Sequence, residues 1–208
     1  MKLSIIIPMY NEQESLDALF MELSGLFSQE AKTEIIFIND GSSDDTLSIL
    51  ESKIKNYSSW KVINLYRNYG KSVALQAGFD NSKGEIIATM DADLQDNPKQ
   101  IYNLIEELEK GYDVVSGWKK NRKDPLEKKI ASKIFNFFVR VFSALKIHDS
   151  NCGIKVFKRE VTEMLTLYGG RHRYIPLLAH QKKFLISEVV VDHREREFGV
   201  SKYGVKRY

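Results

Sequence analysis

Residues 85–95 read Glu85-Ile86-Ile87-Ala88-Thr89-Met90-Asp91-Ala92-Asp93-Leu94-Gln95, an apolar run that passes directly into two carboxylates. The apolar part predicts a strand, and the two aspartates then stand just beyond its carboxyl end. Two carboxylates at this spacing can share one hard cation, Mg²⁺ or Mn²⁺, and Gln95 can add a carbonyl oxygen. The alternative is an ordinary acidic turn before the helix that opens at Pro98.

Working outward, short β-rich runs alternate with helically spaced apolar residues. Strands are predicted at residues 3–7, 34–38, 60–65, 85–90 and 113–116, and helices at residues 12–26, 73–79, 98–110 and from the caps at 42–45 to about 55. This alternation predicts βαβ units and an α/β fold, with a mainly parallel sheet flanked by helices. The polar clusters at residues 8–12, 39–45 and 91–95 each follow a strand. We therefore expect them to converge at one edge of the sheet.

The second half, from about Trp118, has a different pattern. A basic segment is followed by a long apolar-rich helix, a strand near residues 154–157, a helix at 159–167 and a strand at 185–191. No repeat or low-complexity linker separates the two parts. We expect a single domain over residues 1–208, with a donor half at 1–118 and an acceptor half at 119–208.

Composition limits the class of protein. The chain of 208 residues has a net charge of +3, which is too small to argue for nucleic-acid binding, and its one cysteine rules out an internal disulfide. No signal peptide and no apolar run long enough to span a bilayer is visible. The basic-aromatic ending Lys206-Arg207-Tyr208 suggests a native chain that continues, and a transmembrane extension is one expectation.

Two further loops carry polar side chains that suit a nucleotide. Tyr10 can stack on a base, Glu12 can accept from a ribose or cap a helix, and Asp40 can accept from a base or ribose. For Asp40 the alternative is helix capping alone. A phosphate loop ending at Gly70-Lys71-Ser72 is excluded, because the glycine that it needs five residues before Gly70 is Leu65.

Four motifs occur together in order: Ser4–Glu12, Asn39–Ser42, Arg67–Lys71 and Asp91–Gln95. In this the chain resembles the family 2 glycosyltransferases of the GT-A fold, over nearly its whole length. Three further stretches resemble the polyprenyl-phosphate branch of that family, which includes dolichyl-phosphate mannose synthases and bactoprenol glucosyltransferases. They are Asp113–Gly117, Asp149–Gly153 and Arg196–Gly204.

The resemblance implies roles for individual residues. The nucleoside pocket would be lined by Pro8, Tyr10, Glu12, Ile38 and Asp40, and Lys71 would belong to the donor site. The residues facing the metal and diphosphate would be Asp91, Ala92, Asp93 and Gln95, with Arg196 and Lys202 as a basic pair on the phosphates. Lys119 stands where many relatives have arginine, and Arg122 is the alternative source of that cation. Lysine gives a point charge whereas arginine gives a bidentate fork.

The acceptor half holds a basic amphipathic segment at residues 128–147. Its apolar face is formed by Ile130, Ile134, Phe135, Phe138, Val141, Phe142 and Leu145, opposite Lys129, Lys133, Arg140 and Lys146. Periodicity alone favours a core or subunit-contact helix, whereas the family resemblance favours a helix at an anionic membrane surface. Asp149 matches the position of a base in relatives, with a capping aspartate as the alternative.

The resemblance implies an inverting transfer of a hexose from a UDP- or GDP-sugar to a polyprenyl phosphate, at the cytoplasmic face of the cell membrane. A phosphate monoester has a second pKa of about 6, so the acceptor is already a nucleophile near neutral pH. The alternatives are a transferase that extends a surface polysaccharide on a sugar hydroxyl, and a non-catalytic nucleotide-sugar-binding scaffold. An oligomer is compatible with this sequence, and a nucleic-acid partner is not expected.

Overall fold

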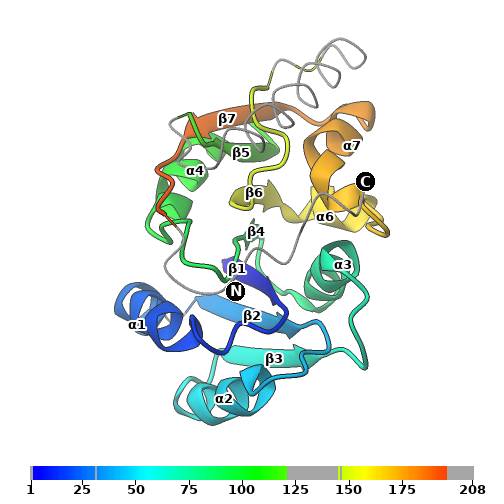
Figure 1. Ribbon diagram of the computed structural model, residues 1–208. Helices are drawn as coiled ribbons and strands as arrows, with labels where there is room; N and C mark the ends of the chain where they lie inside the picture. Colours follow the sequence, from blue (N-terminus) through cyan, green and yellow to red (C-terminus); the bar gives the residue numbers. More distant parts are fainter. Residues whose placement is uncertain (1, 31, 121–144, 146, 196–208) are drawn as a thin grey trace.

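The computed structural model describes residues 2–30, 32–120, 145 and 147–195, and within them the strands form one sheet (Figure 1). The strands are β1 (Leu3–Met9), β2 (Thr33–Asn39), β3 (Trp60–Asn64), β4 (Ile86–Thr89), β5 (Val114–Trp118), β6 (Lys155–Lys158) and β7 (Ile186–Val190). The helices are α1 (Leu16–Phe27), α2 (Thr46–Lys53), α3 (Lys71–Asn81), α4 (Gln100–Leu108), α6 (Arg159–Met164) and α7 (Ile175–Gln181), with the 3₁₀ turns η1 (Ile54–Asn56) and η2 (Arg171–Tyr174).

The strand order is β3-β2-β1-β4-β6-β5-β7. Neighbours among β1 to β4 pair in parallel, β6 runs antiparallel to both β4 and β5, and β5 pairs in parallel with β7. The predicted α/β class and mainly parallel sheet are therefore confirmed. The direction of β6 was not predicted, because a strand pattern of four residues carries no signal for its orientation.

Side chains alternate across the strands and build a core on each face of the sheet. Ile5 and Ile7 of β1 pack with α1 and α4, whereas Ile6 packs with α3, α6 and α7 on the other face. This is the period of two expected for a strand covered on both sides. Figure 1 shows the helices on the two faces of the sheet. A ligand site is therefore expected at the strand ends.

Several helix boundaries differ from the sequence prediction. The helix predicted from residue 12 begins at Leu16, because the backbone N–H of Glu12 donates to Thr46 Oγ1 (2.8 Å) and that of Ser15 to Glu12 O (3.1 Å). The helix predicted at 159–167 ends at Met164. The turn η2 and helix α7 were not predicted. The proposed membrane-interface helix at 128–147 lies almost entirely outside the described residues.

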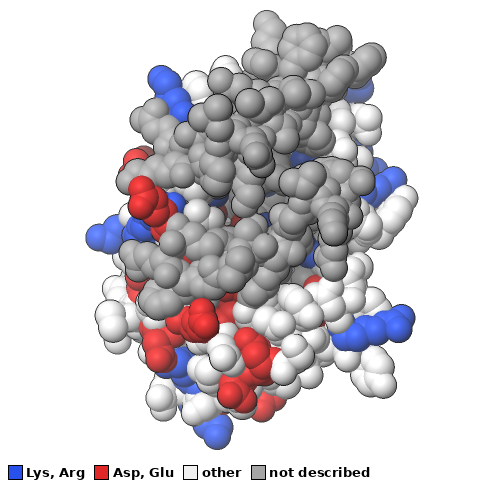
Figure 2. Space-filling model, viewed as in Figure 1, with Lys and Arg blue, Asp and Glu red and all other residues white. Residues whose placement is uncertain are grey.

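The visible face of the molecule carries charges of both signs. In Figure 2, Asp and Glu gather in the lower half of the view, and Lys and Arg lie mainly around the margins. Within the described residues, no helix combines the length and apolarity needed to cross a membrane.

Candidate active site

The first two predicted clusters interlock at the carboxyl ends of β1 and β2. The backbone N–H of Asn11 donates to Ser42 Oγ (2.9 Å), and that of Asp40 donates to Met9 O (2.9 Å). The third cluster follows β4, which pairs with β1, and Met90 N–H donates to Ile6 O (3.2 Å). The predicted convergence of the three polar loops at one sheet edge is therefore confirmed.

Asp40 braces the turn that precedes α3. Its buried carboxylate accepts the backbone N–H groups of Tyr69 (2.8 Å) and Gly70 (2.9 Å). Burial raises the pKa of Asp40, and the two amides oppose that rise. Gly70 has a φ of 92°, a left-handed conformation that favours glycine. The carboxylate thus orders the loop that delivers Lys71, and its contact with a nucleoside stays a prediction.

Lys71 and Asp91 form an ion pair between α3 and the loop after β4. Lys71 is the first residue of α3, and its Nζ contacts Asp91 Oδ1. Burial raises the pKa of Asp91, but the cations of Lys71, Lys119 and Lys155 outweigh it and lower the pKa to about 2. Asp91 is therefore an ionised carboxylate throughout the physiological pH range.

Residues 91–96, here named the acidic loop, alternate between buried and half-exposed positions. Ala92, Leu94 and Asp96 are buried, and the odd-numbered residues are half-exposed. Leu94 has a φ of 60°, a strained backbone conformation for a leucine, and its side chain is held in the core. In this conformation Asp93 Oδ1 accepts a hydrogen bond from the backbone N–H of Gln95 (3.2 Å).

Gln95 ties the acidic loop to the segment after β7. Its backbone O accepts the N–H of Arg194 (3.0 Å), and its side-chain Nε2 donates to Arg194 O (3.3 Å). The guanidinium of Arg194 in turn pairs with Glu22 on α1. Gln95 was predicted to offer a carbonyl oxygen to a metal, and that role stays a prediction beside the observed one.

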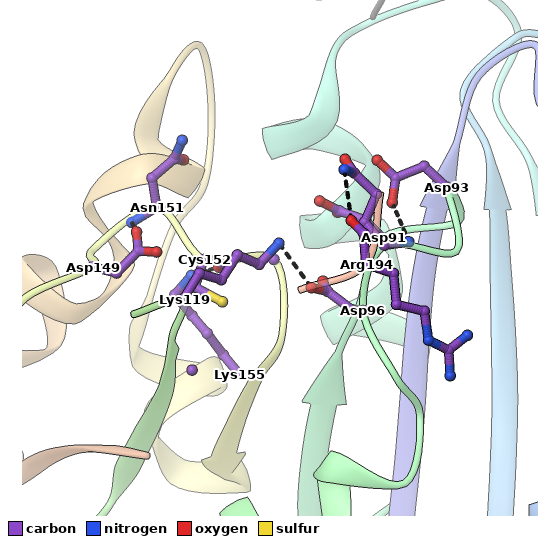
Figure 3. A network of polar contacts seen from close by, with 12 residues as sticks. Asp91, Asp93, Asp96, Lys119, Asp149, Asn151, Cys152, Lys155 and Arg194 are labelled. Atoms are coloured by element: carbon purple, nitrogen blue, oxygen red, sulfur yellow. Dashed lines mark hydrogen bonds and ion pairs between the residues drawn. The ribbon is translucent and has the colours of Figure 1, made fainter. Parts of the chain in front are cut away.

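A buried ion pair joins the acidic loop to the end of β5. Lys119 Nζ lies 2.7 Å from Asp96 Oδ1, and the two side chains are 8% and 0% exposed. Figure 3 shows Lys119 reaching across from the side of Asp149 and Cys152 toward Asp96. Burial acts to lower the pKa of Lys119, but Asp96 outweighs it and the pKa is raised. Lys119 was predicted, with Arg122 as the alternative, as a diphosphate contact; its ammonium pairs with Asp96, and the diphosphate contact stays a prediction.

The opposite wall of the site comes from residues 149–155. Gly153 lies so close to the acidic loop that a methyl group on its Cα would stand 2.5 Å from Asp91 Oδ2. Lys155 on β6 is buried, its Nζ contacts Cys152 O, and burial lowers its pKa. Burial also raises the pKa of the Cys152 thiol to about 12, which makes it unreactive.

Asp149 is also buried, and its Oδ1 accepts the backbone N–H of Asn151 (3.2 Å). This is the local hydrogen bond of an aspartate that orders a turn. A catalytic role for Asp149 stays a prediction.

A serine and a histidine connect α3 to η2 beside Lys71. Ser72 Oγ accepts the backbone N–H of His172 (3.0 Å) and lies 2.9 Å from His172 Nδ1. Burial, with the cations of Lys71 and Arg173, lowers the pKa of His172 to about 3. The imidazole is therefore neutral near pH 7.

The remaining predicted residues lie at the same edge or outside the described residues. Pro8, Tyr10 and Glu12 are half-buried, whereas Ile38 is fully buried and packs in the core. Arg122, Arg196 and Lys202 lie outside the described residues. A separate cavity of ≈ 380 Å³, lined by residues that include Lys2, Thr33 and Tyr102, contains none of the predicted site residues.

The donor atoms at the acidic loop suit a hard divalent cation. Asp91 and Asp93 supply carboxylate oxygens at a strand end, and the described residues contain no group of three or more His, Cys, Asp or Glu that could hold a metal. Mg²⁺ characteristically binds through one or two carboxylates together with substrate phosphates and water. The residues present fit such a cation when a diphosphate completes its coordination.

Sequence reasoning missed Asp96, Lys155, His172 and the Glu22–Arg194 pair. Apart from Lys155, which contacts Cys152 O three residues away, each has a partner distant in the chain, such as Glu22 and Arg194, separated by 172 residues. Lone charged residues in helices and strands carry no local motif. Only Asp96 had a local signal, because it directly follows the predicted site residues 91–95.

Comparison with known proteins identifies the family of this chain. The family described as "Glycosyl transferase family 2" matches residues 4–166. The chain is 36% identical over 213 residues to a dodecaprenyl-phosphate galacturonate synthase of Rhizobium johnstonii, covering 100% of this chain and 63% of the relative. It is 38% identical over 208 residues to an undecaprenyl-phosphate 4-deoxy-4-formamido-L-arabinose transferase of Yersinia pestis, covering 99% and 64%. The chain thus spans just under two thirds of the length of these relatives.

Solved structures share the fold. The glucosyl-3-phosphoglycerate synthase of Mycobacterium tuberculosis superposes with a TM-score of 0.72 at 19% identity, covering 94% of this chain and 73% of that one. A mannosyltransferase from Pyrobaculum calidifontis, in complex with GDP-Man and Mn²⁺, superposes with a TM-score of 0.69 at 18% identity, covering 94% and 58%.

Proposed function

This chain belongs to glycosyl transferase family 2, and from that premise we propose that it transfers a hexose from a nucleotide sugar to a polyprenyl phosphate. The observation that carries the proposal is the Asp91–Asp93 pair at the convergence of three strand-end loops, with Lys71 on Asp91. Similarity along 99–100% of the chain to two polyprenyl-phosphate sugar transferases supports the choice of acceptor.

On this proposal Asp91 and Asp93 would hold Mg²⁺ or Mn²⁺, which when bound would supply positive charge against the leaving nucleoside diphosphate. Asp91 is ionised and ready to bind, because three lysines keep its pKa low. Lys71 holds one oxygen of Asp91 and stands where it can meet a phosphate. Leu94 and Gln95 fix the backbone, so the carboxylates keep their places when the donor enters.

The acceptor phosphate needs cations more than it needs a base. A dianionic phosphate attacks in line without losing a proton, so a buried Asp149 is not required to be basic. A UDP- or GDP-sugar, with Tyr10, Glu12 and Asp40 at its nucleoside, remains our proposal for the donor. Arg122, Arg196 and Lys202 are proposed as cations for the phosphates.

We propose the cytoplasmic face of the membrane as the place of reaction, with residues 128–147 on anionic lipid. Each basic residue near such a surface contributes about 1 kcal/mol, and salt screens it. Flotation of the protein with anionic vesicles is therefore expected to weaken as salt rises. Phe138→Asp combined with Phe142→Asp is expected to abolish flotation, and unchanged flotation would show that the aromatic face is buried against protein.

The direct test of the reaction is extraction of lipids after incubation with membranes and radiolabelled UDP- or GDP-sugar. Label in a polyprenyl-phosphate sugar supports the proposal, whereas label only in polysaccharide contradicts it. Asp93→Asn is expected to lose most activity while the fold persists, because one anionic ligand is removed from a hard cation. Full turnover of the wild type in EDTA would exclude the metal.

A further inference from the structure

The segment after β7 returns to the acidic loop from the far edge of the sheet. β7 pairs with β5 at that edge, and Val191 N–H still donates to Trp118 O (3.0 Å). Figure 1 shows the chain then running down toward α1. By Arg194 it lies against Gln95, with hydrogen bonds in both directions between the two residues.

These bonds act on the strained part of the site. Leu94, with its φ of 60°, lies between Asp93 and Gln95, and Asp93 accepts the Gln95 N–H. A left-handed leucine persists only where its surroundings hold it. The backbone of Arg194 makes two hydrogen bonds to Gln95, the residue after Leu94. Movement of residues 192–195 would therefore displace Gln95 and, through the Gln95 N–H, Asp93.

The anchor for this segment is an ion pair on α1. The guanidinium of Arg194 contacts Glu22 Oε1, and the two side chains are 37% and 31% exposed. Glu22 lies on the half-exposed side of α1, whose buried side packs in the core. Figure 3 shows Arg194 beside the Asp91–Asp96 segment, with its guanidinium extending away from it.

We propose that Glu22 and Arg194 are positioning residues: their ion pair fixes residues 192–195 against α1 and thereby sets the place of Asp93 for a divalent cation. The metal part rests on the proposed function. Neither side chain bonds directly to the Asp91 or Asp93 carboxylate in the described structure, so they act through the Arg194 backbone and Gln95.

The test uses the full chain and Mn²⁺ alone, with binding measured from the electron paramagnetic resonance signal of free Mn²⁺. Glu22→Arg and Arg194→Glu change the local charge in opposite directions. A long-range charge effect would therefore weaken binding in the first and strengthen it in the second. Positioning predicts that both weaken it, by about two- to fivefold for a part-exposed ion pair.

The double reversal Glu22→Arg with Arg194→Glu is expected to restore binding, and Arg194→Lys to restore part of it. Asp17→Lys is the matched control, because Asp17 also lies on α1 but pairs with Lys53 of α2 (2.5 Å) rather than with the segment after β7. Hydrogen exchange of peptides covering 92–95 and 192–195 gives a readout that needs no metal. Both single reversals should speed this exchange.

Exchange in the single variants equal to that in Asp17→Lys would overturn the proposal, as would a double reversal that restores neither exchange nor binding. If the wild type binds no Mn²⁺ even with UDP or GDP present, the metal-dependent function fails. In that case the exchange result alone decides whether the pair positions the acidic loop.

Discussion

Replacing Lys119 by methionine is expected to be one of the most destabilising single changes at the site. The substitution keeps most of the side-chain volume but leaves the Asp96 carboxylate without its cation. Asp96 is buried, and within the described residues its carboxylate oxygens have no hydrogen-bond donor beyond the Lys119 ion pair. Breaking a buried pair by removing one partner costs about 3–5 kcal/mol, because the remaining charge is uncompensated.

The double variant Lys119→Met with Asp96→Leu separates the charge from the packing. Replacing both members of a buried ion pair by apolar groups is often neutral, so the double variant should recover most of the lost stability. Urea unfolding at pH 7 measures the difference, read as a change in midpoint with the slope unchanged. Lys110→Met, which breaks an exposed pair with Glu107, serves as the control and should leave the midpoint unchanged. A Lys119→Met variant within about 1 kcal/mol of wild type at pH 7 would refute the reasoning.

Two further substitutions and one titration test the neighbouring contacts. Gly153→Ala should impair turnover and Mn²⁺ binding, because its Cβ would meet Asp91 Oδ2 at 2.5 Å, and Mn²⁺ titration of a folded variant checks this. Asp40→Ala should weaken nucleotide binding with or without metal, since two amides of the turn before Lys71 lose their acceptor, and calorimetry with and without Mn²⁺ decides it. The ring signals of His172 should not titrate by NMR between pH 5 and 8, because its pKa is about 3. Since the unfolded histidine takes up a proton at higher pH than the folded one, the free energy of unfolding should fall as pH drops below about 6.5.

The sequence predicts the parts of this protein that are local. The apolar run at residues 3–7 and the carboxylates directly after residue 90 are patterns of neighbouring positions, and the strands predicted from them are confirmed. The α/β class follows from their alternation with helices.

The parts that depend on distant partners could not be predicted. Lys119 is 23 positions from Asp96, and nothing in its neighbourhood distinguishes a buried ion pair from a phosphate contact. Gln95 offers both an amide donor and a carbonyl acceptor, and only the position of Arg194, 99 residues away, shows which group is engaged. The metal, the nucleoside contacts and the membrane helix stay predictions.

The antiparallel strand β6 limits how the two halves of the chain can move relative to one another. β6 is hydrogen-bonded to β4 on one side and to β5 on the other, so the two halves of the chain share one continuous ladder. A hinge between them would break that ladder, which makes closure of one half onto the other unfavourable. Opening and closing around substrates must therefore be performed by the segments at the strand ends. On the proposed function, a new sugar or acceptor would for the same reason be more readily gained by exchanging those segments than by recombining halves at residue 118.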